Sequence, residues 1–447
     1  MLRRLTIATL LFGMFAVSAR AQVPFNRTTM PTRSALGRVG MERHWYGVVP
    51  LGGVTERVIR LSLAGDMVFA QTNRANFHAF DSETGRYLWG VNLGLPTNVA
   101  RAASVNSDMV FTTNSKKLYA IDRKTGRFHW EKTLEDLPAG PTAADDEYVM
   151  VGLATGKLVA YTTRDHTKDN PPGLSAATFA WAWKTNGKLT GRPIPADRVV
   201  AFGSGDGKVY VSLIDKSTLL YRFLTGGPII GSMGTYGTRT LFVPSGDNNM
   251  YSIDLFTGDS HWTYPSGAPI EQEPLVAGKD LYFINALGVM TALDADHGTL
   301  KWEVSTSNGR LLSLSPTKVY LETFDRDLMV VDRSSGRVTS SPRDTFERSG
   351  LNLREFTLTP TNRLNDRLYF ATPSGMIFCA REIGAIKPNF VRDPNAPKFG
   401  KIDPDGEPAT PPAVPSATED EPAATDDAMP EDADVPAPDD DAMPEER

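Results

Sequence analysis

Six histidines are the residues of this 447-residue chain that could most readily bind a metal ion. His44, His129 and His261 each precede a tryptophan in separate parts of the chain, and no pair of histidines has the spacing of zinc ligands. The segment Gly203–Lys208 (GSGDGK) has the glycines and the lysine of a phosphate-binding loop. Its spacing is wrong, however, and Val209 stands where Ser or Thr would bind magnesium. We therefore predict no catalytic residue, no cofactor site and no metal site.

A repeated unit must position whatever the chain binds. Over residues 44–383, two apolar strands joined by a tight turn recur about every 40 residues, followed by an Asp-x-x-x-Gly turn and an aromatic residue. Asp suits this turn because it accepts hydrogen bonds from the turn backbone, and Gly suits it because Gly adopts positive φ. The aromatic residue should pack against a neighbouring unit, which is a framework role. The full motif comprises Asp81, Gly85 and Trp89; Asp122, Gly126 and Trp130; Asp254, Gly258 and Trp262; and Asp294, Gly298 and Trp302.

Weaker copies bring the count of units to eight. The pairs Asp215 and Phe223, and Asp332 and Ser340, keep the offset of eight residues that separates Asp from Trp in the full motif. Eight strand hairpins at this period predict an all-β protein, an eight-bladed β-propeller of four-stranded antiparallel blades. The eighth unit has no outer strand after it, whereas Trp45 has no hairpin before it. We therefore expect the N-terminal strand to close the last blade and to remove an open sheet edge.

The repeat resembles the PQQ-like repeat of the quinoprotein-like eight-bladed propellers, over about residues 44–383. That family contains quinone-dependent dehydrogenases and non-catalytic relatives, of which the outer-membrane assembly factor BamB is the closest in kind. For a dehydrogenase, the resemblance implies PQQ with a calcium ion, an Asp base and often a disulfide between adjacent cysteines. Cys379 is the only cysteine, so that disulfide is impossible, and the long insertions that carry the calcium ligands have no obvious counterpart.

The two ends of the chain differ in composition from the repeat. Residues 1–21 combine a start with two arginines, a short apolar stretch and an Ala-Arg-Ala site, which is typical of a secretory signal peptide. No cysteine directly follows the apolar stretch, so we expect no lipid anchor. The stretch is too short to cross a bilayer, so we expect no membrane span. Residues 22–43 should form an extended basic arm, and residues 384–402 a linker. Residues 403–447 hold sixteen Asp or Glu, one Arg, ten Pro and no aromatic residue, which predicts a disordered acidic Pro/Ala-rich tail.

The acidic tail hides the charge of the propeller. The formal net charge is −6, but residues 403–447 carry −15 and residues 22–402 carry +6. A mildly basic body without a run of Lys or Arg does not predict a nucleic-acid partner. The hexapeptide Asp-Asp-Ala-Met-Pro-Glu occurs at residues 426–431 and again at 440–445. The tail could therefore be a solubilising segment or an acidic docking segment.

Two insertions into the repeat are candidate partner-binding loops, because long loops on a rigid scaffold often carry function. The first spans residues 164–177 and the second spans residues 341–353. Since propeller loops alternate between faces, these two should lie on opposite faces of the ring. Their candidate residues are Arg164, Asp165 and His166 in the first loop, and Arg343, Phe346 and Arg348 in the second.

These features predict an exported, monomeric, non-catalytic scaffold. It would bind a protein partner in the cell envelope, either in the periplasm or outside the cell. One alternative is a PQQ-dependent (quinoprotein) dehydrogenase that uses PQQ and calcium. A further alternative is a structural or adhesive surface protein, which the acidic tail would also suit.

Overall fold

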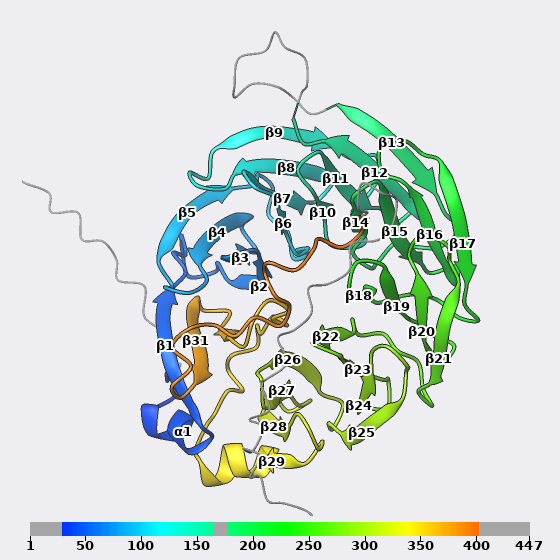
Figure 1. Ribbon diagram of the computed structural model, residues 1–447. Coiled ribbons are helices and arrows are strands. Elements are labelled where there is room, and N and C mark those ends of the chain that lie inside the picture. Colours follow the sequence, from blue (N-terminus) through cyan, green and yellow to red (C-terminus); the bar gives the residue numbers. More distant parts are fainter. Residues whose placement is uncertain (1–28, 165–177, 402–447) are drawn as a thin grey trace, which may run out of the picture. The chain divides into compact units, whose positions relative to one another are not determined.

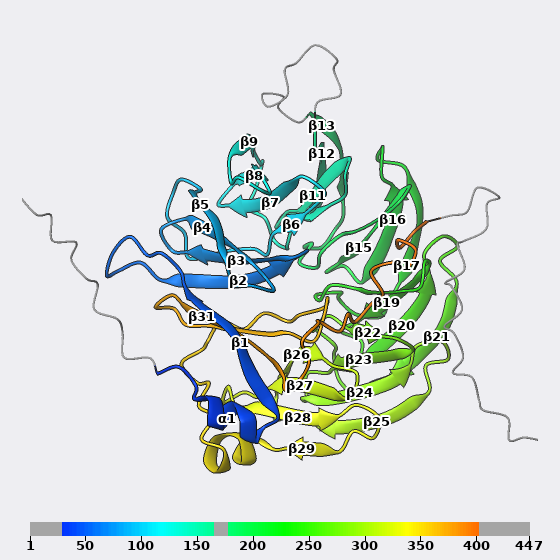
Figure 2. The same ribbon diagram turned by 60° about the vertical axis from the view of Figure 1, so that its left-hand side comes forward.

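The computed structural model describes residues 29–164 and 178–401, which form a ring of eight β-sheets around a central channel (Figures 1 and 2). The all-β, eight-bladed propeller is therefore confirmed. The predicted signal peptide at 1–21, the predicted acidic tail at 403–447, and Asp165 and His166 lie outside these residues. Neither of the short helices in the described residues is long and apolar enough to cross a bilayer.

Seven blades are four-stranded antiparallel sheets whose strands follow one another in chain order from the channel outward. Blade 1 consists of β2 (Val58–Ala64), β3 (Met67–Thr72), β4 (Asn76–Asp81) and β5 (Tyr87–Asn92), and blade 2 of β6 (Ser104–Val105), β7 (Met109–Asn114), β8 (Lys117–Asp122) and β9 (Phe128–Thr133). Blade 3 consists of β10 (Ala143–Ala144), β11 (Tyr148–Gly152), β12 (Lys157–Thr162) and β13 (Phe179–Lys184), and blade 4 of β14 (Ile194–Ala196), β15 (Val199–Ser204), β16 (Lys208–Leu213) and β17 (Leu219–Leu224). Blade 5 consists of β18 (Gly234–Tyr236), β19 (Thr240–Pro244), β20 (Asn249–Asp254) and β21 (Ser260–Pro265). Blade 6 consists of β22 (Leu275–Ala277), β23 (Asp280–Ile284), β24 (Val289–Asp294) and β25 (Leu300–Ser305). Blade 7 consists of β26 (Arg310–Leu314), β27 (Lys318–Glu322), β28 (Leu328–Asp332) and β29 (Val338–Ser340).

The burial of each strand follows from its place in the blade. In blade 2 every residue of β7 is buried, because both faces of this strand pack against neighbouring blades. The outer strand β9 alternates between exposed and partly covered residues, and Trp130 is its one buried residue. The hydrophobic core therefore lies between blades rather than inside any one of them. One cluster joins Phe111 and Trp130 of blade 2 to Val149 and Val151 of blade 3.

The repeat motif joins each blade to the next. The indole Nε1 of Trp89 in blade 1 donates a hydrogen bond to the backbone oxygen of Arg123 in blade 2, at 2.9 Å. The same ring lies against Gly126, where an added Cβ would come within 2.8 Å of the indole and where φ is +74°. Asp122 holds this turn by accepting hydrogen bonds of 2.7 Å from the backbone nitrogen and the hydroxyl of Thr125. Gly is therefore required both by the turn and by the close approach of the ring.

The same contact recurs around the ring. Each of these indole Nε1 atoms donates to a backbone oxygen just after the third strand of the next blade. The donor and acceptor residues are Trp45 and Ser82, Trp89 and Arg123, Trp130 and Thr163, Trp181 and Ile214, Trp262 and Ala295, and Trp302 and Arg333.

Blade 4 differs from the sequence prediction. The residue in the tryptophan position is Tyr221, not Phe223, because Tyr221 pairs with Val211 as Trp89 pairs with Ala79 in blade 1. The hydroxyl of Tyr221 lies 2.7 Å from the backbone oxygen of Leu255, and its ring lies against Gly258. The turn therefore follows the end of β16 rather than Asp215. The aromatic residue still lies eight residues after the first position of the turn motif, but both positions come two residues earlier than the sequence predicted.

The N-terminal strand closes the ring, as predicted. Blade 8 consists of β30 (Leu368–Ala371), β31 (Met376–Glu382) and, as its outer strand, β1 (Met41–Val48). Trp45 pairs with Cys379, which is a fully buried core residue. The innermost position of this blade is reduced to a single bridge between Leu358 and Ala371, so blade 8 has three strands instead of four.

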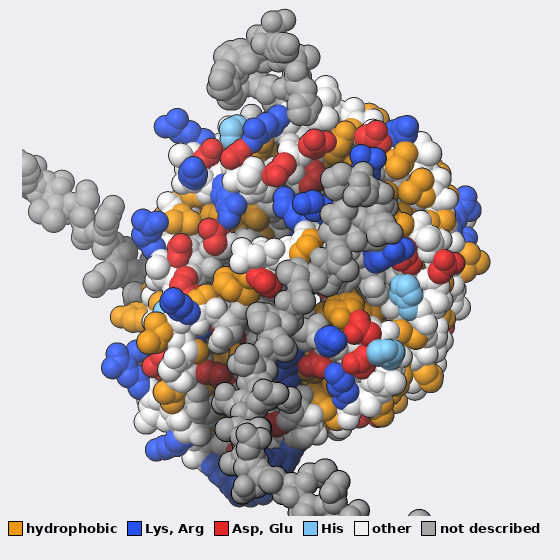
Figure 3. All heavy atoms as spheres, in the orientation of Figure 1, with side chains coloured by type: hydrophobic (Ala, Val, Ile, Leu, Met, Phe, Trp, Pro, Cys, Tyr) orange, Lys and Arg blue, Asp and Glu red, His pale blue; other side chains and the backbone are white. Residues whose placement is uncertain are grey.

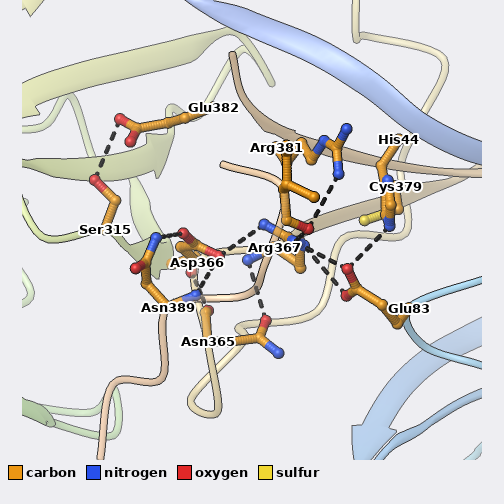
Figure 4. A network of polar contacts seen from close by, with 12 residues as sticks. His44, Glu83, Ser315, Asn365, Asp366, Arg367, Cys379, Arg381, Glu382 and Asn389 are labelled. Atoms are coloured by element: carbon orange, nitrogen blue, oxygen red, sulfur yellow. Dashed lines mark hydrogen bonds and ion pairs between the residues drawn. The ribbon is translucent and has the colours of Figure 1, made fainter. Parts of the chain in front are cut away.

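A buried polar network stabilises the closed ring at the junction between blade 8 and blade 1 (Figure 4). The guanidinium of Arg367 is fully buried and lies 2.9 Å from a carboxylate oxygen of Glu83 in blade 1 and 3.0 Å from Asp366. Nε2 of His44, on the closing strand, lies 3.0 Å from the same Glu83. Asn389 donates to the other oxygen of Asp366 at 2.5 Å. Segments from both ends of the propeller therefore meet around one ion pair.

The N-terminal arm is not extended throughout, contrary to the prediction for residues 22–43. Helix α1 (Arg33–Arg38) precedes β1 and begins at the cap residue Thr32, whose hydroxyl accepts a hydrogen bond from the backbone nitrogen of Ala35. Leu36 of α1 is buried in a cluster with residues of blades 7 and 8. Blade 7 has Ser340 in the tryptophan position, so the helix fills the one junction between blades that lacks an aromatic ring there.

The predicted linker packs against the ring. Residues 384–401 form a strap that crosses from blade 8 over the centre of the ring to blades 4 and 5 (orange in Figure 1). The backbone nitrogen of Val391 donates to Leu364 at 2.9 Å, and that of Gly400 donates to Thr238 in blade 5 at 2.7 Å. The strap therefore ties the end of the propeller to its opposite side.

Candidate functional site

The two faces of the ring are built from different turns. The motif face carries the Asp-x-x-x-Gly turns between third and fourth strands, and the strap lies on it. The connector face carries the hairpins between second and third strands and the connectors from one blade to the next. Because strands alternate in direction, this assignment follows from the strand order.

The channel contains a cavity of about 1030 Å³. Its walls come from the innermost strands and connectors of several blades, including β2, Ala143, Pro193 and Leu311, and Phe324 lies on its connector-face side. A second cavity of about 280 Å³ lies next to it and is lined in part by Arg392 of the strap. The two cavities share five lining residues, which are Arg192, Pro193, Pro195, Glu273 and Arg363.

Positive charge dominates the lining of the larger cavity. Two carboxylates lie among the lining residues, Glu273 and Glu322, and both are already ion-paired. Glu273 pairs with Arg363, and Glu322 pairs with Arg310 at 2.5 Å. The five arginines of the lining are Arg60, Arg192, Arg310, Arg326 and Arg363.

Two of these arginines have no carboxylate partner within the described part of the chain. Arg60 makes one long hydrogen bond, of 3.4 Å from Nη1 to the backbone oxygen of Ala100, and its Nε is buried without a partner. The Nε of Arg192 is likewise buried without a partner. Buried donors without acceptors are costly, because they have given up hydrogen bonds to water. Both arginines are among the lining residues, but these two Nε atoms are buried beneath the cavity surface.

The positive charges also act on one another. Burial lowers the pKa of Arg192 to about 10, and the positive charge of Arg363 adds to that effect, while Glu273 opposes it. Burial likewise lowers the pKa of Arg60, and neighbouring Arg101 and Arg310 lower it further. Both guanidinium groups remain charged at neutral pH. The site is therefore a concentrated positive charge in a partly dehydrated space, which favours an anionic ligand.

Exposed apolar side chains lie on turns and connectors of the connector face, and one of them, Phe324, also lines the cavity. Phe324 is 78% exposed on the hairpin of blade 7, and Leu95 is 75% exposed on the connector that follows blade 1. We call these residues the apolar rim, and it comprises Val54, Leu95, Val99, Leu137, Ile230, Leu287 and Phe324. Large exposed apolar side chains on one face are typical of protein interaction surfaces.

The motif face has a different character. On the face turned to the viewer in Figure 3, Lys and Arg side chains alternate with Asp and Glu, and neither sign forms a continuous patch. Several of these charges pair across neighbouring turns. Arg123 lies 2.5 Å from Asp66, and Arg333 lies 3.0 Å from Asp280. These ion pairs on the motif face therefore join parts of the ring to one another.

The described residues of the two predicted partner-binding loops are not among the residues that line the channel cavity. Arg164 is on the motif face and forms an ion pair with Asp108. Phe346 and Arg348 belong to a π-helical turn, Asp344–Arg348, on the connector side after β29, and Arg343 is the cap residue that precedes it. Each has a partner within the chain: Arg343 pairs with Glu347 at 2.8 Å, Arg348 pairs with Asp344 at 2.7 Å, and the guanidinium of Arg354 lies 3.8 Å from the centre of the Phe346 ring. The described parts of the two loops do lie on opposite faces.

Four of the described histidines contact other side chains within a single blade or at a junction between blades. His129 lies 3.5 Å from Asp122, His297 lies 3.0 Å from Asp294, and His78 is buried beside Tyr87. In the part of the chain that the structure describes, no group of three or more His, Cys, Asp or Glu could hold a metal ion.

Sequence reasoning missed the channel arginines, although a signal for them exists. An arginine recurs seven or eight residues before the second strand in four units, namely those of blades 1, 2, 4 and 7. These residues are Arg60, Arg101, Arg192 and Arg310. The position marks the start of the innermost strand, which faces the channel. Arg101 donates to the backbone oxygen of Pro138 at 3.3 Å and has no carboxylate partner among the described residues.

Comparisons with known proteins agree with this architecture. A family model described as outer membrane protein assembly factor BamB matches residues 28–221 and 214–398. BamB from Shewanella oneidensis is 23% identical over 266 residues, which is 56% of this chain and 62% of that protein. The chain thus matches less than two thirds of the length of that relative.

Solved structures support the fold. The crystal structure of BamB from Moraxella catarrhalis matches with a TM-score of 0.59 and 15% identity, over 76% of this chain and 97% of that one. The computationally designed Ika8 protein matches with a TM-score of 0.58 and 13% identity, over 75% and 99% of the two chains. Since the family model spans nearly the whole propeller, the chain belongs to the PQQ-like propeller family of the outer membrane protein assembly factor BamB.

Proposed function

We propose that this protein is a non-catalytic scaffold of the cell envelope that binds a protein partner through its connector face. The observation that carries the proposal is the set of exposed apolar side chains of the apolar rim on the connector face. Membership of the BamB family supports a partner in the machinery that assembles outer-membrane proteins. The protein would act as an exported monomer, and its closed ring would hold the rim in one geometry.

The rigidity of the ring favours binding by a preformed surface. The connectors that carry the rim are fixed at both ends by strands, and the ring is closed by β1 and by the buried ion pair between Arg367 and Glu83. A surface that is ordered before binding loses little conformational entropy when a partner docks. Large apolar side chains such as Phe324 then supply most of the binding free energy.

The residues of the channel do not fit the dehydrogenase alternative. PQQ chemistry there needs calcium, which takes six to eight oxygen ligands. Glu273 and Glu322, the carboxylates among the lining residues, are both held by arginines. The donor set of this channel therefore favours anions, and we derive no catalytic step from it.

Site-specific photo-crosslinking in cells tests the proposal. A photoreactive residue at Phe324 or Leu95 should cross-link to a subunit of the outer-membrane assembly machinery. The same residue at Leu300, which is 51% exposed on the outer strand β25, should not. The double variant Phe324→Asp, Leu287→Asp should reduce co-purification of the cross-linked partner at least tenfold without lowering the melting temperature.

Two results would contradict this function. Equal cross-linking from Leu300 and from the rim would show that the rim is not the binding surface. Recovery of the protein from the cytoplasm rather than from the envelope fraction would remove the proposed location. Light scattering after gel filtration tests the monomer, since a mass of twice 48.8 kDa less the leader would indicate a dimer.

A further inference from the structure

We propose that the central channel binds a ligand with two phosphoryl groups, and that two clusters of arginines each hold one of these groups. The first arginine cluster lines the larger cavity and comprises Arg60, Arg310 and Arg326. The second arginine cluster lines the smaller cavity and comprises Arg192, Arg363 and Arg392. The inference does not depend on the proposed function, which rests on the apolar rim.

The first arginine cluster surrounds one buried carboxylate. Glu322 lies 2.5 Å from Nε of Arg310 and 3.7 Å from Nη1 of Arg326. The side chains of Arg310 and Arg326 are 39% and 40% exposed, whereas that of Glu322 is 7% exposed. Arg60 lines the same cavity without a carboxylate partner among the described residues. Three arginines and one carboxylate leave two positive charges uncompensated, and the guanidinium groups rather than the carboxylate face the cavity.

The second arginine cluster repeats this arrangement. Arg363 forms an ion pair with Glu273, and its side chain is 40% exposed, whereas that of Glu273 is 18% exposed. Arg192 and Arg392 line the smaller cavity beside this pair, and neither has a carboxylate partner in the described part of the chain. The hydrogen bonds of the Arg392 guanidinium go to backbone oxygens of the strap and of blade 5. Two positive charges therefore remain here as well.

The two clusters are close enough for one ligand to reach both. The two cavities share five lining residues, and Arg192 and Arg363 are among them. Burial is the main cause that lowers the pKa of Arg192, and the positive charges of Arg363 and then of Arg60, in the first cluster, lower it further. The larger cavity of about 1030 Å³ is at the upper end of the range of roughly 300–1,000 Å³ for small-molecule sites.

Phosphoryl groups fit these clusters better than carboxylates do. A phosphate monoester carries a charge of about −1.5 to −2 near neutral pH and has three acceptor oxygens, so one group can offset two positive charges and accept from several guanidinium groups. A carboxylate has one charge and two oxygens. The Nε atoms of Arg60 and Arg192 are buried beneath the cavity surface, so the terminal nitrogens of these side chains would make the contact. The charge-assisted hydrogen bonds that arginine donates to phosphate are the strong kind.

Calorimetric titration of the full chain tests the number and the kind of anionic groups. Hexanediol bisphosphate should bind at one site per chain, at least tenfold more tightly than hexyl monophosphate, because only the bisphosphate can engage both clusters. It should also bind at least tenfold more tightly than octanedioate, a dicarboxylate with the same spacer. The bisphosphate should raise the melting temperature of the protein, because it binds the folded ring and not the unfolded chain.

Variants locate the site. Arg60→Gln in the first cluster and Arg192→Gln in the second should each weaken binding of the bisphosphate at least tenfold, to about the affinity of the monophosphate. Both variants should melt close to the parent temperature, since neither change leaves a carboxylate without its partner. Arg222→Gln is the matched control, because Arg222 is exposed on the outer strand β17 and is not among the channel-lining residues.

A second pair of variants keeps the test valid if the first pair does not fold. Arg326→Gln and Arg392→Gln remove one charge from each cluster at more exposed positions, and each should weaken binding in the same way. Unchanged affinity in all of the folded channel variants would overturn the site. Equal affinities for the bisphosphate and the monophosphate would overturn the two-cluster arrangement, and octanedioate binding as tightly as the bisphosphate would overturn the phosphate.

A vesicle assay identifies the source of the phosphates. The probe is a phosphatidylcholine vesicle with added cardiolipin, whose headgroup has two phosphates, and the control is phosphatidylcholine alone. Sedimentation with the cardiolipin vesicles that hexanediol bisphosphate reverses and Arg192→Gln abolishes would assign the site to a lipid headgroup. No sedimentation, with the bisphosphate still bound in solution, would assign it to a soluble molecule, and either result upholds the site. Cross-linking of a partner from Leu95 is a separate test, so failure of the phosphate site leaves the proposed function standing.

Discussion

Arg367 of blade 8 and Glu83 of blade 1 form an ion pair of 2.9 Å across the junction where the two ends of the propeller meet. The arginine side chain is fully buried, and Asp366, also fully buried, holds its other side at 3.0 Å. Arg367 and Glu83 are 284 positions apart in sequence. The ring therefore depends on a polar contact at closure in addition to the pairing of β1 with β31.

Replacement of Arg367 by Met should strongly destabilise the protein. The change leaves the buried carboxylate of Asp366 without its cation, and such a loss typically costs about 3–5 kcal/mol. Urea unfolding followed by tryptophan fluorescence measures the effect. Arg343→Met is the control, because the pair between Arg343 and Glu347 is exposed and should contribute only about 0–1 kcal/mol. Similar midpoints for the two variants would show that the buried pair has no special role.

Trp130→Ala should remove a contact between blades 2 and 3. The indole is buried, and its Nε1 donates to the backbone oxygen of Thr163 at 3.1 Å. Truncation of a large buried aromatic residue costs roughly 3–5 kcal/mol. Thermal unfolding followed by circular dichroism should show a clearly lower midpoint. Phe128→Ala, an exposed position on the same strand, should change it little, and a parent-like melt of Trp130→Ala would refute the framework role.

Gly126→Ala separates the two reasons for glycine in the motif. Positive φ costs a non-glycine residue about 1–2 kcal/mol. The added Cβ would also lie 2.8 Å from the ring of Trp89, and such overpacking costs a further 1–3 kcal/mol, roughly. Gly350→Ala measures the first cost alone, because Gly350 has φ of +69° and nothing within 4 Å of an added Cβ. Equal losses of unfolding free energy in the two variants would mean that the indole moves aside.

Leu36→Ala should destabilise the junction of blades 7 and 8. Leu36 is buried in a cluster with Phe356 and Phe378, at the one junction without a motif aromatic. Loss of a buried leucine side chain typically costs about 2–5 kcal/mol. Urea unfolding gives the value, and Arg33→Ala on the exposed side of α1 is the control. No loss of stability from Leu36→Ala would restore the view of this segment as a dispensable arm.

Asp332 should contribute to acid sensitivity. Hydrogen bonds from Ser335 and Ser334 hold the pKa of Asp332 at about 2, below the unfolded value of about 3.9. A lowered folded pKa stabilises the protein above about pH 4, and that contribution is lost as the pH falls from about 4 to 2. Asp332→Asn should therefore flatten the decline in melting temperature over this window. Glu355→Gln, at an exposed position, should leave the decline unchanged, and an equally steep decline in Asp332→Asn would contradict the role of this turn.

The number of blades and the mode of closure were predictable from the sequence. The reason is that each blade is a local unit, so its hairpin and its Asp-x-x-x-Gly turn leave a pattern within about 40 residues. Trp45 indicated the closing strand because it repeated the outer-strand pattern without a hairpin of its own. The sequence pattern failed where another residue or element stands in place of the motif. Tyr221 was missed because Leu213 and Ser217 occupy the Asp and Gly positions of its turn. Helix α1 was missed because it packs against distant blades.

The channel was decided by the tertiary structure alone. Arg60, Arg192 and Arg310 are widely separated in sequence, and each is an ordinary charged residue at the start of a short strand. Their significance comes from the ring, which turns the innermost strands of seven blades toward one axis. Glu322 pairs with Arg310, whereas Arg60 and Arg192 have no carboxylate partner among the described residues. Which charges remain depends on distances across the channel, and no pattern along the chain records those distances.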